Sequence, residues 1–574
     1  MARQTHRLTW RLLILMLALL LGAGGVVVRL VQVQILDHDY YAAQAQLVHA
    51  NQAQIRAPRG VILDRNGYPL ATTVDAFDVY IDPRSWGNDA VALRGAAEVA
   101  PLLNREPIGL ITAARAQEQG DYLAAQAVSA SVGLQLMELA TPGVQLVDRS
   151  SRFYPEGDLA STLLGFIGRD QVGLAGIEAD FDLELGGIPG TVYFEQDGRG
   201  DPIPFGRRLL DEPTSGGDLR LTIDRFIQRL VEQKLDEKIE EHEATGGTII
   251  VMDPRSGEIL ALASRPSFRL SELDLEDASQ TEFFRNRAVT DVYPPGSAMK
   301  VITMAAAIDT GLVTSESTYY DDGAAEMGGV TIRNWDLSAH GTTTASQVLQ
   351  LSLNTGAVWL AGLLGPDQFY QYVERFGFGE TTHVGLGGEA AGLVRTHKDS
   401  LWCRCDLATN SFGQGLAATP LQMITATAAL VNGGLLMRPY IVKEVAGPEG
   451  SRLFEPVVVR RAVSEETSRT LVQMMNAVVE GREDHPARVP GYRVGGKTGT
   501  STLIDSPNTI ASFIGFAPVE DPQLIMLVKI DEPQDSRLGS IVAAPIFAEL
   551  APQLLAYLGV PPDNIALVER AREP

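Results

Sequence analysis

The chain has 574 residues, of which 45% are hydrophobic and 21% charged, a composition typical of folded globular proteins and a length too great for one ordinary domain. Its net charge of −24 argues against a general nucleic-acid binder, because the sequence offers no sustained basic face. Its two cysteines, Cys403 and Cys405, are too few and too close in sequence to stabilise a protein of this size through disulfides. We therefore expect two or more domains stabilised by packed cores.

An apolar run near the N-terminus predicts a membrane anchor. Residues Leu12 to Val28 are 17 residues without a charge, close to the shortest length that spans a bilayer. A cleaved signal peptide is the alternative, but the small-residue cleavage pattern is poor and the run exceeds a usual signal-peptide core. The arginines before the run place the N-terminus in the cytoplasm and the rest of the chain outside: Arg3, Arg7 and Arg11.

The next part of the chain offers no catalytic cluster. Leu30 to Gln54 predicts an amphipathic helical continuation, and Ala57 to Thr73 predicts a strand that enters a tight turn at Asn66-Gly67. Asp89 to Glu138 predicts short helices, and the glycine-studded stretch from Ser151 to Asp197 predicts turns and linking segments. We interpret this part as a platform that spaces something from the membrane; an independent binding module is the alternative.

A loop-forming cluster at Glu212 to Gly217 marks a boundary, and a strand and an amphipathic helix started by Thr222 and Asp224 follow it. Two pairs of apolar strands have such short links that they must pair antiparallel: residues 246–253 with 257–264, and 511–518 with 523–530. The long middle, Ser297 to Gly434, is mostly helical in pattern. The second domain is therefore predicted to be α+β, with an antiparallel sheet whose first and last strands flank a helical insertion.

The stretch Tyr293 to Gly311 predicts a buried helix that starts at or just before Ser297 and stops at Gly311. Ser297 and Lys300 share one face of it, which places a potential nucleophile beside a potential base, because a desolvated lysine can lose its proton near neutral pH. The alternative is a lysine that extends from a buried helix beside a capping serine. Only seven of the 47 basic residues are lysines, so a lysine kept where arginine is usual favours the chemical role.

Two further groups could serve this serine. Ser352 and Asn354 lie two residues apart at a predicted helix end, where they could face a cleft or simply cap the helix. Gly495 to Thr500, GGKTGT, lies in a strand-like run whose glycines would let another backbone or a ligand approach. A phosphate-binding loop is disfavoured because the Walker spacing is absent, and a plain glycine-rich turn stays open.

Three motifs, SAMK at residues 297–300, SLN at 352–354 and KTGT at 497–500, together resemble the active site of penicillin-binding proteins and serine β-lactamases. The resemblance extends to class B penicillin-binding proteins over nearly the whole chain after the apolar run, in the stretches APRGVILDRNG, GLAGIEADFDLELGGIPG, NRAVTDVYPPGSAMK, SFGQGLAATPLQ and ASFIGFAP. A β-lactamase would lack the anchor and the platform. The bifunctional class would carry a glycosyltransferase domain, of which residues 37–215 show no counterpart.

The resemblance implies a penicillin-binding/serine β-lactamase-like transpeptidase domain, α+β with helices flanking an antiparallel sheet. It would follow an extended α+β pedestal similar to the penicillin-binding protein dimerisation domain, and one N-terminal transmembrane helix. The expected parts are a cytoplasmic tail, the anchor with the start of a stalk, the non-catalytic pedestal, the transpeptidase domain and a C-terminal tail, at residues 1–11, 12–36, 37–215, 216–560 and 561–574.

The implied activity is that of a D,D-transpeptidase that cross-links peptidoglycan through a serine acyl-enzyme. Ser297 would attack the carbonyl of the penultimate D-Ala of a stem peptide, and Lys300 would take its proton. Ser352 would help relay that proton to the leaving amine, and Asn354 would bind the substrate amide. The backbone N–H groups of Ser297 and Thr500 would form the oxyanion hole. The terminal carboxylate and its surroundings would be bound by Lys497, Thr498, Gly499 and Thr500.

The resemblance also implies partners: D-Ala-D-Ala stem peptides, β-lactams trapped at Ser297, the lipid bilayer, and a membrane glycan polymerase with the division or elongation machinery. It implies no metal, organic cofactor or nucleic acid. The SFGQG stretch, the glycine-rich FGFGETTHVGLGGEAAGL and the length are more similar to the septal, cell-division type than to the rod-elongation type. A β-lactam sensor without turnover and a division scaffold are the rival functions.

One departure from the family pattern is the stretch from His397 to Asn410, which contains Cys-x-Cys and a nearby histidine. A metal site there is short of ligands. We expect a loop with incidental thiols.

Overall fold

The structure, a computed structural model, describes residues 2–41, 50–195, 208–273, 277–502 and 508–563. The chain divides into two compact units. The first unit consists of Met1–Pro58 and Gly187–Ser215, and the second of Arg59–Gly186 and Gly216–Pro574.

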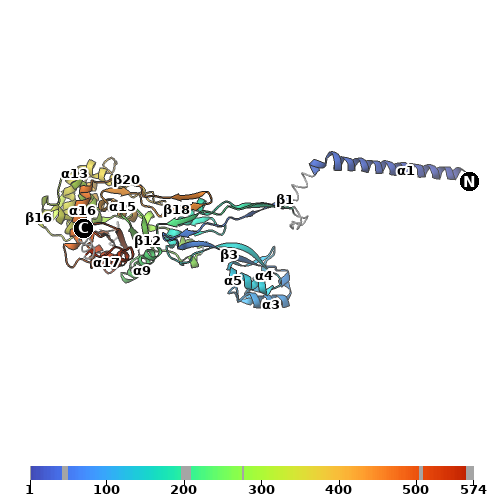
Figure 1. Ribbon diagram of the computed structural model, residues 1–574, viewed down its shortest axis with the longest axis horizontal. Helices are drawn as coiled ribbons and strands as arrows, with labels where there is room; N and C mark the ends of the chain where they lie inside the picture. Colours follow the sequence, from blue (N-terminus) through green and yellow to red (C-terminus); the bar gives the residue numbers. More distant parts are fainter. Residues whose placement is uncertain (1, 42–49, 196–207, 274–276, 503–507, 564–574) are drawn as a thin grey trace, which may run out of the picture. The chain divides into compact units, whose positions relative to one another are not determined.

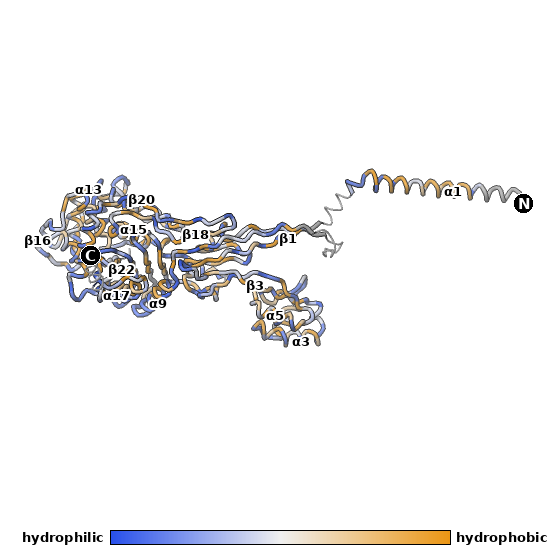
Figure 2. Tube along the Cα trace, viewed as in Figure 1, coloured by the Kyte–Doolittle hydropathy of each residue, from blue (hydrophilic) through white to orange (hydrophobic). Residues whose placement is uncertain are grey.

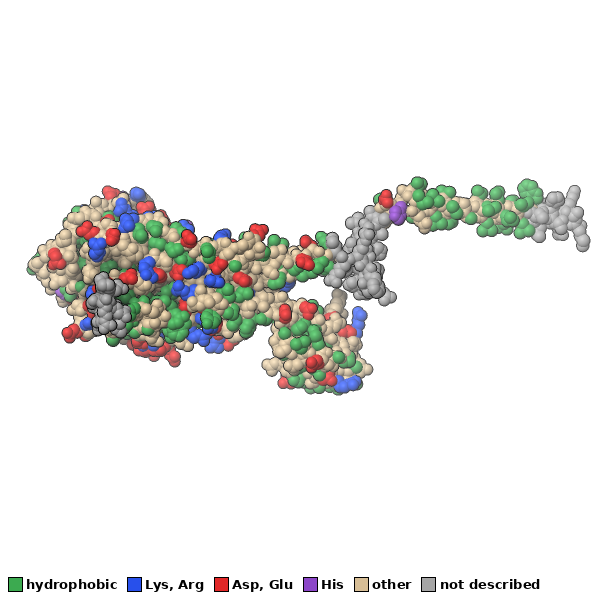
Figure 3. Space-filling model, in the orientation of Figure 1, with side chains coloured by type: hydrophobic (Ala, Val, Ile, Leu, Met, Phe, Trp, Pro, Cys, Tyr) green, Lys and Arg blue, Asp and Glu red, His purple; other side chains and the backbone are tan. Residues whose placement is uncertain are grey.

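The first unit begins with the long apolar helix α1 (Ala2–Val31), which ends in a π-helical turn, η1 (Gln32–Leu36). Its apolar side chains from Trp10 onward are exposed, and Figure 3 shows them along the visible face of the helix. Figure 2 shows the hydrophobic character of these residues along the chain. Residues Trp10–Leu36 are long and apolar enough to cross a membrane. The helix Gly539–Tyr557 passes the same test, but it is largely buried within the second unit and packs in its core.

The predicted helical continuation to Gln54 is wrong at its end. After Leu36 only a short turn of helix follows, and Ala50–Ile55 forms a strand, β1; residues 42–49 lie outside the described residues. Strand β1 pairs antiparallel with β8 (Gly190–Glu195), which pairs with β9 (Arg208–Asp211). Pairing with a distant strand therefore overrides the local helical propensity of this Ala- and Gln-rich segment.

The second unit starts with a seven-stranded sheet that confirms the predicted strand and turn at the motif APRGVILDRNG. Its main path runs β19-β18-β10-β2-β3-β4, and β5 pairs with β3. Asp64 accepts hydrogen bonds from the backbone of Asn66 and Tyr68, and Gly67 has φ +87°, so the turn between β2 and β3 is tight. The strands are β2 (Ile62–Leu63), β3 (Pro69–Ile81), β4 (Tyr122–Ser129), β5 (Val144–Phe153), β10 (Asp218–Leu221), β18 (Val442–Gly447) and β19 (Gly450–Leu453).

Three short helices pack beside the far end of β3, as predicted for Asp89 to Glu138 (Figure 1). They share a core centred on the fully buried Trp86. Strand β4, which pairs with β3 between the second and third helices, was not predicted. The helices are α3 (Asp89–Val99), α4 (Pro107–Ala116) and α5 (Ala130–Leu139), preceded by the 3-10 turn η2 (Ser85–Gly87).

The glycine-studded stretch forms short elements and turns, as predicted. A fully buried carboxylate, Glu178, accepts hydrogen bonds from Arg59 at 2.7 Å and from Arg152 at 2.6 Å, which ties this stretch to the sheet. Both guanidinium groups are also almost fully buried, so each charge in the cluster has a partner. The elements are α6 (Ser161–Leu164), β6 (Phe166–Ile167), β7 (Gly173–Ala175), α7 (Gly176–Asp180) and α8 (Asp182–Leu185).

A five-stranded antiparallel sheet, in the order β12-β11-β23-β22-β21, confirms both predicted hairpins. The first two strands and the last three flank the helical middle of the chain, as expected for the α+β domain. The strands are β11 (Gly246–Met252), β12 (Ile259–Arg265), β21 (Gly495–Thr502), β22 (Thr509–Ala517) and β23 (Leu524–Asp531).

Both faces of this sheet are buried, which explains why its strands are apolar without alternation. Ile249 belongs to the core on the side of α9 (Arg225–Glu241) and α17 (Gly539–Tyr557). The next residue, Ile250, belongs to the core on the opposite side. That side holds α10 (Arg287–Thr290), α11 (Lys300–Asp309), α15 (Pro420–Val431) and α16 (Glu465–Glu480).

The helical middle is interrupted by small sheets that the sequence pattern did not predict. Its other helices are α12 (Ala345–Gln350), α13 (Asn354–Arg375) and α14 (Arg404–Ser411). The two-stranded sheets in and after it pair β13 (Thr318–Asp321) with β16 (Gly341–Thr344), β14 (Ala324–Met327) with β15 (Val330–Arg333), and β17 (Leu435–Met437) with β20 (Val458–Arg461). The 3-10 turns η3 (Leu270–Glu272) and η4 (Ala278–Phe284) precede the helical middle, and η5 (Gly296–Met299) opens it.

Candidate active site

The nucleophile candidate lies on a 3-10 turn pressed against the edge strand β21. The predicted helix does begin just before Ser297, but its first turn is the 3-10 turn η5, and the α-helix proper starts at Lys300. Gly296 has φ +55°, and a Cβ there would lie 2.4 Å from the carbonyl oxygen of Thr500. Glycine is therefore required for the turn to reach the strand.

Lys300 lies in the interior behind this turn. Its side chain is 1% exposed, and Nζ donates to the carbonyl oxygen of Ser352 at 2.6 Å and to Oδ1 of Asn354 at 2.7 Å. Nζ also lies 3.4 Å from Ser352 Oγ. Burial, and then the positive charge of Lys497, hold the pKa of Lys300 well below its ordinary value.

Ser352 connects the two lysines. It occupies the link between α12 and α13 with φ +57°, a left-handed conformation that turns both its carbonyl and its hydroxyl toward Lys300. Its Oγ also accepts a hydrogen bond from Lys497 Nζ at 3.0 Å. The capping alternative is not what the structure shows, because the N-cap residue of α13 is Leu353 and has no side-chain cap.

Asn354 is fixed from behind by strand β15 and the residue after it. Its Nδ2 donates to the carbonyl oxygen of Arg333 at 2.9 Å, and its backbone N–H donates to Oδ1 of Asn334 at 3.1 Å. Asn334 is 1% exposed and donates to the buried carboxylate of Asp321 at 2.8 Å. The amide oxygen of Asn354 is thereby aimed at Lys300.

Lys497 projects from β21 and is 2% exposed. Besides Ser352, its Nζ contacts the hydroxyl of Thr498 at 3.4 Å. Burial lowers the pKa of Lys497 to about 7. The expectation that glycines in this strand admit close neighbours is confirmed at Gly499, where a Cβ would lie 2.7 Å from the carbonyl oxygen of Pro295.

A cavity of about 340 Å³ opens at this point. Its lining includes five of the predicted site residues: Ser297, Ser352, Lys497, Thr498 and Thr500. Lys300 and Asn354 support it from behind through the hydrogen bonds above, and Gly499, within β21, lies close to the turn that carries Ser297. Three motifs that lie up to 200 residues apart in sequence are thus brought together around one cavity.

Family models match the chain in two places. Residues 247–551 match the "Penicillin binding protein transpeptidase domain", and residues 54–221 match the "Penicillin-binding Protein dimerisation domain". The chain belongs to the penicillin-binding protein transpeptidase family. It is a serine-type peptidoglycan D,D-transpeptidase of the class B kind, in which a pedestal precedes the catalytic domain.

Individual relatives agree with this membership of the family. Stage V sporulation protein D of Bacillus subtilis is 36% identical, covering 88% of this chain and 79% of that protein. Peptidoglycan D,D-transpeptidase FtsI of Escherichia coli K12 is 30% identical, covering 97% and 93%. Among solved structures, penicillin-binding protein 3 of Mycobacterium tuberculosis in complex with aztreonam has a TM-score of 0.68 at 27% identity, covering 89% of this chain and 98% of that one. Penicillin-binding protein 2X of Streptococcus thermophilus, with a TM-score of 0.74 at 23% identity and coverage of 88% and 80%, supports the fold alone.

The transpeptidase cavity has a wall that sequence reasoning missed. Arg482, Asp484, His485 and Pro486, in the link between α16 and β21, line it, and Trp335 lies on another wall. These residues form no known motif. Their position in the sequence could have indicated them, because the charged run GREDHP comes shortly before the strand that carries KTGT.

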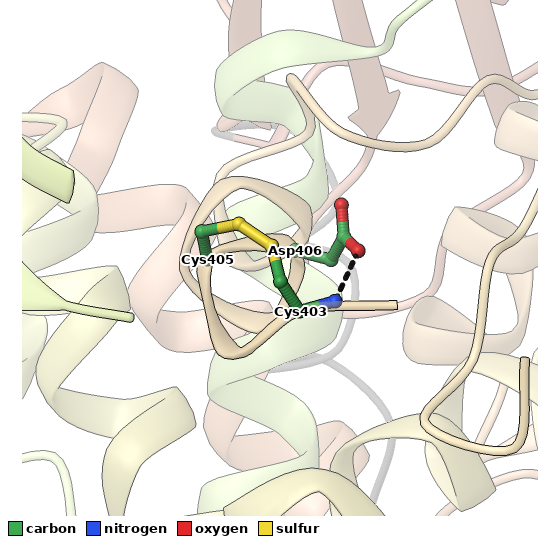
Figure 4. A group of neighbouring side chains, drawn as sticks. All are labelled: Cys403, Cys405 and Asp406. Atoms are coloured by element: carbon green, nitrogen blue, oxygen red, sulfur yellow. Dashed lines mark hydrogen bonds between the residues drawn. A yellow bond between two sulfur atoms is a disulfide. The ribbon is translucent and has the colours of Figure 1, made fainter. Parts of the chain in front are cut away.

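The two cysteines of the transpeptidase are joined to each other at the start of α14, so the expectation of incidental thiols is wrong (Figure 4). Cys403 is the N-cap residue of that helix, and its backbone N–H donates to Asp406 at 2.9 Å. Asp406 and the two sulfur atoms lie close enough to suggest a metal site. A disulfide, however, leaves neither sulfur as the thiolate that a metal requires.

Proposed function

We propose that Ser297 is the acylated nucleophile of this transpeptidase and that Lys300 is its base. Ser297 Oγ attacks the carbonyl carbon of the penultimate D-Ala, and its proton passes to Lys300 Nζ. The bond to the terminal D-Ala breaks, and that D-Ala leaves as an amine with a proton returned through Ser352. An amine of a neighbouring stem peptide then attacks the ester, which forms the cross-link and frees Ser297.

The contacts of Lys300 support the role of base. A neutral amine has two N–H donors and one lone pair. The two short hydrogen bonds, to Ser352 O and Asn354 Oδ1, use both donors and leave the lone pair free to take the proton of Ser297, one helical turn away. Ser352 Oγ, between Lys300 and Lys497, is placed to pass a proton onward.

The strand residues are proposed to bind the donor peptide. Lys497, with the hydroxyls of Thr498 and Thr500, provides a cation and two donors for the terminal carboxylate, and Gly499 lets the strand lie close to Ser297. The backbone N–H groups of Ser297 and Thr500 would receive the oxyanion. Asn354 is proposed to bind the substrate amide: its contacts with Lys300 and Arg333 use one acceptor position and one of its two N–H donors, which leaves a second N–H for the substrate.

β-Lactams, which bind a solved relative, are proposed to acylate Ser297. Purified protein should be labelled by a fluorescent penicillin, and Ser297→Ala should not be. Lys300→Arg should also abolish labelling although it keeps the charge, because a guanidinium stays protonated and cannot act as base. Lys398→Arg, at an exposed lysine, is the matched control. Label on Ser297→Ala would refute the nucleophile, and label on Lys300→Arg would refute the base.

We propose a septal role in cell division, as a single-pass membrane protein with a cytoplasmic N-terminus and an extracytoplasmic catalytic domain. The septal-type sequence features and the exposed apolar helix Trp10–Leu36 support this. The pedestal and anchor are then candidate surfaces for a membrane glycan polymerase. We also propose that the chain divides into five parts, at residues 1–11, 12–36, 37–215, 216–560 and 561–574. The division of the compact units between Ser215 and Gly216 supports the limit between the third and the fourth part. A tagged copy should localise to midcell; signal along the lateral wall would favour elongation instead.

A second candidate is wall synthesis during sporulation, because the relative at 36% identity is named Stage V sporulation protein D. Depletion separates the two roles. Filamentous growth would indicate division, whereas normal growth with a failure to form spores would indicate sporulation.

A further inference from the structure

The cavity contains a histidine to which the mechanism above gives no role. His485 lies in the link between α16 and β21 and lines the same cavity as Ser297, Ser352 and Lys497. It is 9% exposed, so its imidazole is held in place by the protein. It is thus a buried polar side chain at the wall of the substrate site.

The hydrogen bonding of His485 decides which ring nitrogen carries the proton. Nδ1 accepts a hydrogen bond from the backbone N–H of Ala487 at 3.2 Å, so in the neutral ring the proton is on Nε2. Within the part of the chain that the structure describes, Nε2 has no hydrogen-bond partner. Nε2 is not one of the fully buried side-chain atoms that lack a partner, so its N–H is open to the cavity, where water or a ligand can accept the hydrogen bond.

The ring is neutral under ordinary conditions. Burial, followed by the charges of Arg482 and Lys497, lowers the pKa of His485 to about 4, and Arg488 acts in the same direction against Asp484. The guanidinium of Arg482 and the carboxylate of Asp484, 3.1 Å apart, are both mostly exposed. His485 therefore offers the cavity one N–H donor without a second buried positive charge beside Lys497.

The cavity around His485 is rich in donors, which indicates the chemistry of the missing acceptor. Lys497 offers an ammonium group when protonated, and Thr498 and Thr500 offer hydroxyls. A carboxylate has two oxygens and about four acceptor positions, so it can serve several such donors together. We propose that His485 is a substrate-binding residue that donates its Nε2–H to the terminal carboxylate of the donor peptide, beside Lys497; this rests on the function proposed above.

The test compares two thioester substrates that differ only in this group: an acyl-D-alanyl thioglycolate, which ends in a carboxylate, and its carboxamide. kcat/KM is measured by thiol release for wild type, His485→Ala, His485→Gln and His485→Asn. His485→Ala should lose about tenfold or more on the carboxylate substrate, the usual size of a hydrogen bond to a charged group, and little on the carboxamide. His485→Gln should recover most of the loss, because its amide nitrogen lies near the position of Nε2, and His485→Asn should not.

An equal loss on both substrates, or no loss in His485→Ala, would overturn the proposal. Rescue by glutamine with failure of asparagine is a pattern that a merely structural role does not produce, and melting temperatures show whether each variant is folded. His383→Ala, at an exposed histidine that does not line the cavity, is the matched control. Ser297→Ala separates the two proposals, because turnover that persists in it would refute the nucleophile whatever His485 does.

Discussion

At the scale of residues, the roles proposed for the two buried lysines of the site need different charge states. As the proposed base, Lys300 must be neutral to accept a proton, whereas Lys497, proposed to bind a carboxylate, must be charged. Both lie in the interior, and burial lowers both pKa values, but the positive charge of Lys497 lowers that of Lys300 further. Their proximity therefore favours the pair in which Lys300 is neutral and Lys497 is charged.

We predict a bell-shaped pH profile for acylation. The second-order rate constant with a penicillin should rise as Lys300 loses its proton and fall as Lys497 does so, around its pKa of about 7 in the free enzyme. Fluorescent-penicillin labelling rates between pH 5 and 10 give this profile. In Lys497→Arg the falling limb should disappear from that range, because arginine stays protonated. A wild-type rate that keeps rising to pH 10 would contradict the assignment of Lys497.

At the scale of elements, the active site depends on where α13 begins. Asn334, in the loop after β15, accepts hydrogen bonds from the backbone of Asn354 and Thr355 and is itself held by Asp321. All three supporting side chains, those of Asn334, Thr355 and Asp321, are at most 3% exposed. A buried network of this kind, when every member has a partner, specifies one arrangement.

We predict that Asn334→Ala lowers the acylation rate about tenfold or more, because the start of α13 and with it the amide of Asn354 lose their support, at a cost in stability of about 1–3 kcal/mol. The labelling rate and the melting temperature measure the two effects. Asn88→Ala is the control, because Asn88 caps α3 in the same manner, through the backbone of Ala90 and Val91, but far from the site in the chain. It should cost about 1 kcal/mol and no activity. Equal activity losses in the two variants would contradict a specific role of Asn334.

At the scale of the whole molecule, the sequence predicted best where a pattern is local. The two hairpins could be predicted because short links force neighbouring apolar strands to pair. The start of the helix at Ser297 could be predicted because the residues that break a helix act over a few positions. The strand Ala50–Ile55 could not, because its partner β8 lies more than 130 residues away and its own residues favour helix. The position of His485 in the cavity lining could not be predicted either, because a single histidine between two elements forms no recognisable sequence pattern. The disulfide between Cys403 and Cys405 was missed because spacing alone does not show how a chain turns.

We predict that removal of residues 1–36 releases the transpeptidase from membranes without changing its acylation rate, because every described site residue lies in the second compact unit. Fractionation of cells and penicillin labelling of the soluble product check both statements. A truncated protein that stays with membranes would show a further attachment. One that is folded but no longer labelled would show that the anchor segment supports catalysis.

The glycine contacts around the nucleophile turn limit how this enzyme can evolve under antibiotic pressure. A methyl group at Gly296 would meet the carbonyl of Thr500, and one at Gly499 would meet Ser512 Oγ at 2.3 Å, so neither position can gain a side chain without displacing its neighbours. Substitutions that narrow the cavity to a β-lactam would then have to occur at lining residues without a proposed role in catalysis or binding, such as Leu538, Ser540 and Ile541. An inhibitor that binds Ser297, Lys497 and Thr498 would therefore contact a part of the cavity whose backbone is held in place by close packing at the two glycines.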